Sequence, residues 1–281
     1  MRGGGSCSLV IGRMRAAVLR KDELMSEWID PDLDFASHYD REGDPDRDCE
    51  RLYLWHQALC SRPVDGVGPF EIEVSHDWSY GLMLRSPDGA AFRLGSDAII
   101  PTWSTPGWTY RFPPDLVAEI QRDVDGFLRV ASTFGAYVLF PRNGLGQTGP
   151  TINQARGVHP QIADRFDLTL ECIRRHYLDP AMESPLANRL NYYSDFFELF
   201  GDFDTYLRFF LLDDLVTADR ASVRSFLDGE AVTSFPAPAF VVTPSEYTAY
   251  RVNSMRFVQA RNDRIRRLRL SSRPSSSAQT H

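Results

Sequence analysis

The chain has 281 residues, of which 43% are apolar and 25% are charged, proportions typical of a globular protein. Its formal net charge of −7 argues against nucleic-acid binding over the whole surface. No stretch approaches the roughly 20 consecutive apolar residues of a membrane-spanning helix. The four cysteines form no CxxC pair, so the sequence predicts a reducing, cytoplasmic setting rather than a disulfide framework.

Charged residues are unevenly distributed along the chain. Residues 22–50 contain twelve acidic residues and two arginines, whereas residues 251–273 contain eight arginines and one acidic residue. The basic segment is either a nucleic-acid contact through Arg261–Arg269 or a surface that docks on the acidic segment of the same chain. All basic residues except Lys21 are arginine, which suits either bidentate anion recognition or the codon usage of a GC-rich bacterium.

Composition also divides the chain into segments. Residues 1–24 should form a disordered extension, with Met25 as a candidate start, and residues 271–281 should form a disordered, serine-rich tail. The remaining residues, 25–270, hold ample apolar material for one core, so we expect them to form a single globular domain.

The N-terminal half contains one helix pattern followed by strand patterns. After an irregular acidic stretch at 30–48, Leu52 and Leu59 recur at helical spacing and predict a helix over 48–60. Short runs rich in apolar residues predict strands at 70–74, 80–85, 90–94 and 137–141. The turn Ser86–Gly89 should join the second and third of these strands in a hairpin.

Helical patterns dominate the rest of the chain. One helix is predicted over 114–134, with Gly135 as its C-cap. Further helices are expected at 161–177, 184–201 and 204–216, and a last one from the capping box that begins at Thr243. The predicted fold is therefore α+β, with a small antiparallel sheet in the N-terminal half packed by helices and a predominantly helical C-terminal half.

A glycine triad follows the strand at 137–141. Gly144, Gly146 and Gly149 match GxGxxG, but a dinucleotide site also needs a helix that starts at once and faces the pyrophosphate. An extended-looking stretch, Thr151–Asn153, follows instead. The sequence therefore favours a flexible loop over a dinucleotide site.

The densest polar chemistry lies in the loop and helix at 151–177. Guanidinium and amide groups suit a phosphate or carboxylate, so the candidate ligand-binding residues are Asn153, Arg156, Arg165 and Arg175. The candidate catalytic residues are His176, which can transfer a proton, and Asp167 and Glu171, which can orient it. Because charges three or four residues apart also pair along a helix, a purely structural ion-pair network is the alternative.

Two further patterns bear on metal binding. Asp213 and Asp214 can bind a metal ion or act as acid and base only if both face one point, and adjacent helical residues point about 100° apart. Capping or exposure is therefore favoured for both residues. The six histidines form no HxH or HExxH pattern, so we predict no metal site and leave the cofactor unassigned.

Several long blocks resemble an uncharacterised bacterial family that carries a domain of unknown function. The blocks are TINQARG at 151–157, DRFDLTLECIRRHY at 164–177, DFFELFGDF at 195–203 and FFLLDDLV at 209–216. Shorter similar elements are His56–Pro63, Ser96–Pro101 and Ala260–Ile265. The resemblance spans about residues 28–266 and implies a soluble bacterial protein, but it implies no reaction.

Two functions remain open from the sequence. The first is a protein that binds or acts on an anionic small molecule or nucleotide through the 151–177 loop and helix. The second is a non-catalytic interaction or regulatory protein that uses the aromatic helices at 186–212 or the basic helix at 251–269. An open pocket at the candidate residues would favour the first, and burial beneath other side chains would favour the second.

Overall fold

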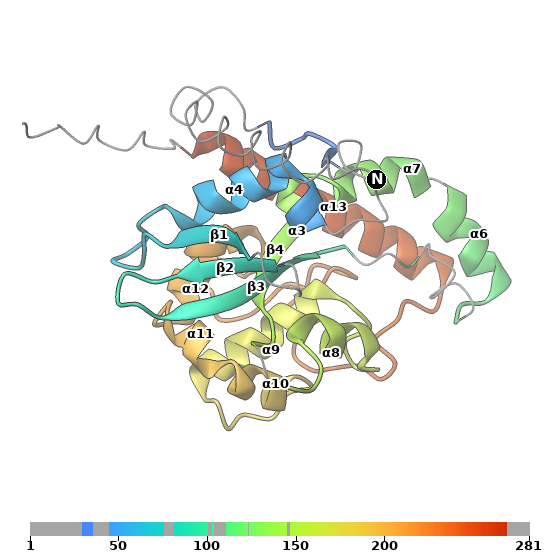
Figure 1. The fold of residues 1–281 in the computed structure, drawn as a ribbon. Helices are drawn as coiled ribbons and strands as arrows, with labels where there is room; N and C mark the ends of the chain where they lie inside the picture. The colour runs from blue at the N-terminus through green and yellow to red at the C-terminus, as the bar shows by residue number, and fades with distance from the viewer. Residues whose placement is uncertain are drawn as a thin grey trace, which may run out of the picture.

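A computed structural model describes residues 30–35, 45–75, 81–100, 103, 111–122, 124–144 and 147–268. The predicted extension, the candidate start at Met25 and the predicted tail lie outside these residues. The fold is α+β, with an antiparallel sheet in the N-terminal half and helices through most of the C-terminal half, as predicted (Figure 1). None of the helices in the described part of the chain is long and apolar enough to cross a membrane.

The sheet is a four-stranded meander in which each strand is antiparallel to the next. Its strands, in spatial order, are β1 (Glu71–Ser75), β2 (Gly81–Arg85), β3 (Ala91–Ala98) and β4 (Tyr137–Pro141). The predicted strands and the hairpin between β2 and β3 are confirmed. However, β3 continues four residues past its predicted end at Leu94, because Ser96 and Asp97 pair with β4.

One face of the sheet is apolar, and its outer edge is covered. Leu82, Leu84 and Leu94 are buried, and Phe92 packs against Phe196 of α11 (Ser194–Glu198) with ring centroids 5.9 Å apart. The carbonyl of Ile72 on edge strand β1 accepts hydrogen bonds from Tyr53 Oη and Gln57 Nε2 of α4 (Glu50–Cys60). Helix α4 therefore covers an edge that would otherwise be open to pairing.

The helices of the N-terminal half depart from prediction at two points. A one-turn helix, α3 (Pro45–Asp48), lies in the stretch predicted to be irregular. The segment predicted as one helix at 114–134 contains α6 (Pro114–Arg122) and α7 (Val124–Ala131), with residue 123 outside the described residues, and its end is the 3₁₀ turn η2 (Phe134–Ala136). Gly135 lies inside η2 and is not a left-handed C-cap, so that prediction is wrong.

The helices predicted at 161–177, 184–201 and 204–216 are shorter than predicted. The helical elements of this half are α8 (Ile152–Val158), α9 (Phe166–Leu178), α10 (Ala187–Tyr192), α11, α12 (Phe203–Phe210), the 3₁₀ turn η3 (Asp213–Leu215) and α13 (Pro244–Arg267). The predicted helix at 184–201 breaks at Tyr193. The predicted helix at 204–216 ends at Phe210, because Leu211 adopts a left-handed conformation with φ 58°.

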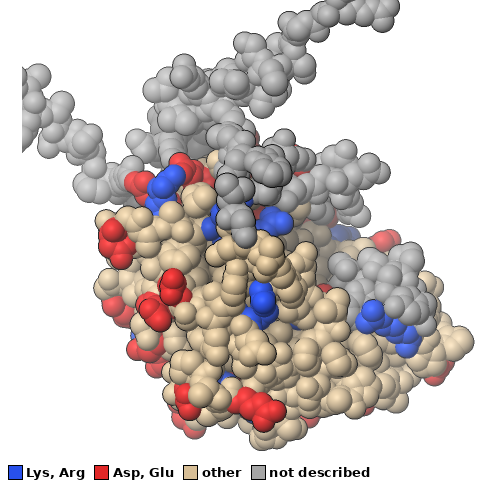
Figure 2. All heavy atoms as spheres, turned by 60° about the horizontal axis from the view of Figure 1, so that its bottom comes forward, with Lys and Arg blue, Asp and Glu red and all other residues tan. Residues whose placement is uncertain are grey.

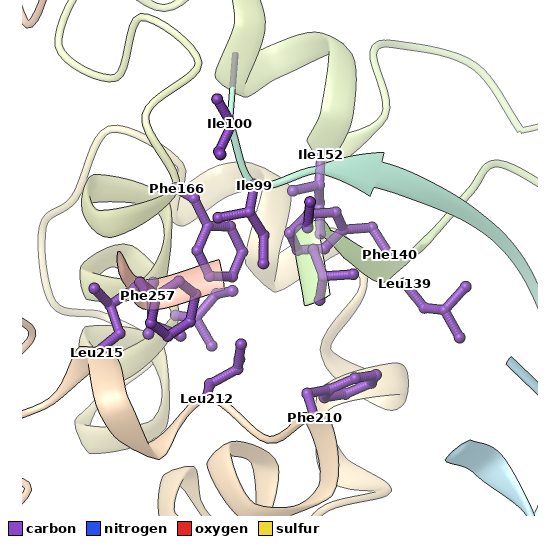
Figure 3. Packing of buried hydrophobic residues seen from close by; sticks show 14 of the residues in the cluster. Ile99, Ile100, Leu139, Phe140, Ile152, Phe166, Phe210, Leu212, Leu215 and Phe257 are labelled. Atoms are coloured by element: carbon purple, nitrogen blue, oxygen red, sulfur yellow. The ribbon is translucent and has the colours of Figure 1, made fainter. Parts of the chain in front are cut away.

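The prediction of an extended stretch at Thr151–Asn153 is wrong. Thr151 and Gln154 form a capping box, the local signal that starts α8 at Ile152. The predicted capping box that starts the last helix at Thr243 is confirmed. The hydrophobic core joins both halves of the chain, and Figure 3 shows side chains from β4, α8, α9, the 210–215 segment and α13 converging on it.

Candidate functional site

Arg156, on α8, is fully buried and joins two other parts of the chain. Its Nε donates to Thr169 Oγ1 at 3.2 Å, and its Nη2 donates to the carbonyl of Asp164 at 2.7 Å. Its Nη1 donates to the carbonyl of Ala98 at 3.1 Å and to the carboxylate of Asp97, both at the end of β3. Arg156 therefore fastens the end of the sheet to α9 and to the turn that precedes it.

Local sequence signals place Arg156 at this junction. The capping box orients α8, with Gln154 N donating to Thr151 Oγ1 at 3.2 Å and Thr151 N donating to Gln154 Oε1 at 2.9 Å. After α8 the chain turns back through Ala163 and Asp164, which have left-handed φ angles of 48° and 64°. This reversal brings Asp164 N to the carbonyl of Arg156 at 2.9 Å, and it explains why α9 starts later than predicted.

Arg165 and Asp167 form a second buried pair. Arg165 Nε donates to Asp167 Oδ1 at 3.2 Å and Nη2 donates to Oδ2 at 2.5 Å, while Nη1 donates to the carbonyl of Ala239 at 3.4 Å. Asp167 Oδ2 also accepts the backbone N–H of Phe226 at 2.8 Å. Both side chains are sealed from solvent, and their contacts hold the 226 and 239 segments against the start of α9.

Glu171 is also enclosed and is held by two arginines. Its carboxylate accepts Arg174 Nε at 2.7 Å and Arg175 Nε at 2.9 Å. The other nitrogens of Arg175 donate to the carbonyls of Glu183 and Thr233, both at 3.3 Å, and its guanidinium lies over a phenyl ring. Every one of these partners belongs to the protein itself.

His176 lies apart from the two carboxylates that were predicted to orient it. Its ring packs 5.4 Å from that of Phe197, and burial lowers the pKa of His176. Asp167 is nine residues earlier on α9, which corresponds to about 13 Å along the helix axis. Glu171 is five residues earlier and therefore points to a different side of the helix. The structure does not bring the three candidate catalytic side chains together.

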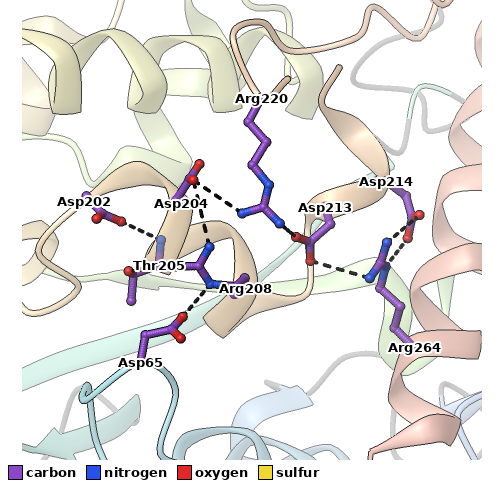
Figure 4. A network of polar contacts seen from close by, with 9 residues as sticks. All are labelled: Asp65, Asp202, Asp204, Thr205, Arg208, Asp213, Asp214, Arg220 and Arg264. Carbon is purple, nitrogen blue, oxygen red and sulfur yellow. Dashed lines mark hydrogen bonds and ion pairs between the residues drawn. The ribbon is translucent and has the colours of Figure 1, made fainter. Parts of the chain in front are cut away.

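Asp213 and Asp214, the adjacent acidic residues of η3, belong to a network of ion pairs and do not form a metal-binding or acid–base site together. Asp213 accepts Arg220 Nη2 at 2.6 Å, and Asp214 accepts Arg264 Nη2 at 2.8 Å (Figure 4). The network ties η3 to α12 and α13. Within the described residues, no group of three or more His, Cys, Asp or Glu side chains has the arrangement of a metal site.

Arg261, the first of the basic residues predicted to contact nucleic acid, is fully buried in α13. Its Nε donates to the carbonyl of Phe210 at 3.0 Å, and Arg62 Nη2 donates to the carbonyl of Phe209 at 2.5 Å. These carbonyls end α12, where the helix dipole places partial negative charge that favours cations. Burial still lowers the pKa of Arg261 to about 9.

The next arginines of α13 pair with acidic groups of the same chain. Arg264 binds Asp214, and Arg266 binds Asp263 and Asp32. Asp32 belongs to the acidic N-terminal segment, and it also accepts Asn262 Nδ2 at 3.1 Å. Within the described part of the acidic segment, Asp32 therefore contacts the basic helix, while Arg269 lies outside the described residues.

A polar pocket of about 460 Å³ lies where the ends of β3 and β4 meet α3 and the start of α8. We call it the Ser96 pocket, and its polar lining residues are Asp46, Ser96, Arg142, Thr151, Asn153 and Gln154. Of the predicted site residues, Asn153 alone lines it. The carboxamide oxygen of Asn153 is enclosed and accepts no hydrogen bond from the described part of the chain.

Asp46 anchors one wall of the Ser96 pocket. Its carboxylate accepts Ser96 N at 2.7 Å and Ser96 Oγ at 2.5 Å, and His56 Nε2 lies 3.7 Å away. Burial alone would raise the pKa of Asp46, but the nearby His56 and the two Ser96 donors outweigh it and lower that pKa. The carboxylate is therefore ionised at neutral pH and already satisfied by protein donors.

Arg142 and Gly95 also line the pocket. The side chain of Arg142 lies across β3, and a Cβ at Gly95 would stand 2.5 Å from Arg142 Cδ. Sequence reasoning missed these wall residues because they come from separate segments. The available signal was the resemblance element that begins at Ser96.

The glycine triad does not form a dinucleotide loop in its described part. Gly144 N donates to Gln147 Oε1 at 2.5 Å, and Gly149 has a left-handed φ of 97°. Gly146 lies outside the described residues. A helix does follow, since α8 starts at Ile152, but the capping box occupies its first turn.

These contacts define an α+β protein in which buried arginines hold helices to the end of a small sheet, beside an open polar pocket. Residues 29–265 match the family described as "Family of unknown function (DUF6994)", and the chain belongs to that family. This match confirms the resemblance seen in the sequence over nearly the same range. No curated protein and no solved structure matches the chain, so neither comparison supplies an activity.

Proposed function

We propose that the protein binds a small anionic molecule, a carboxylate, phosphate or nucleotide, in the Ser96 pocket. The observation that carries this proposal is Arg142, whose side chain lies along the pocket wall in space that Gly95 leaves open. A guanidinium at the wall of a pocket of this size is the usual recognition element for phosphate and carboxylate groups. The carboxamide NH₂ groups of Asn153 and Gln154 add hydrogen-bond donors among the lining residues.

The acidic wall does not oppose an anion. Both carboxylate oxygens of Asp46 accept hydrogen bonds from Ser96, which partly compensate its negative charge. Asp46 is also buried, whereas Arg142 is exposed.

We expect Gly95→Ala and Asn153→Ala each to weaken binding of an anionic ligand about tenfold or more, equivalent to about 1.4 kcal/mol. The alanine methyl at position 95 must displace Arg142, and removal of the Asn153 carboxamide takes away a polar group of the pocket. The measurement is the shift in thermal unfolding with inorganic phosphate, citrate and AMP as probes, because a ligand that binds only the folded protein stabilises it.

The matched control is Asn188→Ala, which removes an exposed carboxamide of α10 outside the pocket. It should leave the shift of every probe unchanged. The proposal is contradicted if none of the three probes stabilises the wild type, or if Asn188→Ala weakens binding as much as Asn153→Ala does.

For the other predicted site residues we propose a structural role. Arg156, Arg165 and Asp167 are sealed among protein partners, and Glu171 is held by two arginines of its own helix. This arrangement supports the structural ion-pair network that the sequence left open as an alternative. Catalysis by His176 receives no support from its packing against Phe197.

A second candidate function is a non-catalytic interaction protein. Exposed apolar side chains lie at the ends of α8 and α9, on the adjoining loop and on α10, namely Val158, Leu178, Met182 and Tyr192. Figure 2, which turns the side of α8 and α10 forward, shows a surface made mostly of uncharged residues. A salt-insensitive monomer with no co-purifying partner in light scattering after size exclusion would count against this function. Nucleic-acid contact through Arg261–Arg269 receives less support, since Arg261 is buried and Arg264 and Arg266 are paired.

We infer further that the protein is a single-domain bacterial protein of the cytoplasm. One hydrophobic cluster extends from Phe35 to Ile265, which supports a single domain. Cys49, Cys60 and Cys172 are free thiols in the interior, and burial raises the pKa of Cys60 to about 12, as suits a reducing compartment. The near absence of lysine supports a GC-rich bacterial source.

A further inference from the structure

Two carboxylates from different parts of the fold meet at one nitrogen of Arg156. Asp97, near the end of β3, is hydrogen-bonded to Nη1, and Asp164, in the turn before α9, places Oδ1 3.4 Å from the same atom. Two carboxylates therefore face a single positive charge. Their side chains are 23% and 21% exposed, so protons can reach them from solvent.

The groups around this pair favour a bound proton. Asp46, on α3, adds a further negative charge that acts on Asp97, and the buried phenol of Tyr250, on α13, lies near Asp164 and Arg156. Burial raises the pKa of both carboxyl groups, to about 7 for Asp164, and Arg156 only partly offsets this effect. Like charges this close to one another disfavour double ionisation.

We propose that Asp97 and Asp164, which both reach Nη1 of Arg156, hold one proton between them and act as a pH-sensitive clamp between the end of β3 and the turn before α9. With the proton bound, Arg156 balances one negative charge and all its contacts are satisfied. Once the proton leaves, two negative charges compete for one guanidinium nitrogen. This inference does not depend on a ligand in the Ser96 pocket.

The turn before α9 is the part of the clamp that should give way. Ala163 and Asp164 both occupy the left-handed region, which non-glycine residues adopt at an energetic cost. Arg156 holds that conformation by donating Nη2 to the carbonyl of Asp164 at 2.7 Å. Repulsion at the carboxylate of Asp164 therefore acts on a segment that this side chain holds together with backbone hydrogen bonds to Arg156 and His159.

The test compares the pH dependence of unfolding in the wild type, Asp97→Asn and Asp164→Asn. A shared proton is bound in the folded state and absent from the unfolded state between about pH 4 and pH 7, so unfolding releases it. The unfolding constant of the wild type should then rise up to about tenfold per pH unit in this window and level off above it. Neither asparagine variant should show this rise of the unfolding constant with pH, because the single remaining carboxylate is balanced by the charge of Arg156.

The matched control is Asp214→Asn, which removes a partly exposed carboxylate paired with Arg264 and should leave the pH slope of the wild type unchanged. Carbon NMR of the aspartate carboxyl groups provides a readout that does not require unfolding. One of the two carboxyls should titrate near neutral pH. The clamp is overturned if both titrate near pH 4, as ordinary aspartates do, or if both variants keep the wild-type slope.

Discussion

Replacing Arg165 with methionine is expected to lower the free energy of unfolding by about 3–5 kcal/mol, the usual effect of breaking a buried ion pair. The substitution leaves the carboxylate of Asp167 enclosed, with the N–H of Phe226 as its remaining donor. Urea unfolding at pH 7 measures the change.

An exposed ion pair provides the control for Arg165. Arg85 and Glu73 form a salt bridge on the sheet surface with both side chains 54% exposed, so Arg85→Met should cost at most about 1 kcal/mol. If Arg165→Met costs no more than Arg85→Met, the buried pair is not structural. The idea that Arg165 serves a ligand would then regain weight.

Local chemistry explains which elements could be predicted from the sequence. The hairpin at Ser86–Gly89 and the start of α13 at Thr243 each depend on residues within one turn of chain, and both were found. The start of α8 carries the same kind of signal, in Thr151 and Gln154, although the stretch Thr151–Asn153 itself looks extended in the sequence. The capping-box pattern is therefore sufficient to predict this helix start.

The Ser96 pocket could not be assembled from local patterns. Asp46 is fifty residues from Ser96 in the chain, and Arg142 reaches Gly95 only because β3 and β4 pair in register. The burial of Arg156 and Arg261 also could not be predicted, because an arginine in an amphipathic pattern is expected at the surface. The tertiary fold brings carbonyls to both arginines and a carboxylate to Arg156.

The role of Gly135 also could not be predicted from local sequence. Its replacement is expected to destabilise the protein more than any other substitution considered above. The sequence suggested a C-cap, but the structure places Gly135 in η2 against α13, where a Cβ would overlap Asn262 Oδ1 and stand 2.6 Å from the carbonyl of Val258. Gly135 N donates to Asn262 Oδ1 at 2.7 Å, and the carbonyl of Gly135 accepts Arg261 Nη1 at 2.8 Å. The residue is glycine because two backbones approach closely there.

Gly135→Ala should therefore lower the free energy of unfolding by about 4 kcal/mol or more, from overpacking together with loss of buried hydrogen bonds. Truncating Asn262 as well should not rescue the variant, since the Val258 carbonyl is backbone and the N–H of residue 135 would lose its acceptor. The control is Gly157→Ala in α8, where a Cβ meets no atom within 4 Å, and alanine there should stabilise the helix by up to about 1 kcal/mol. Urea unfolding measures the free energy of unfolding of both variants. If the two substitutions change it equally, α13 does not pack against η2 as described.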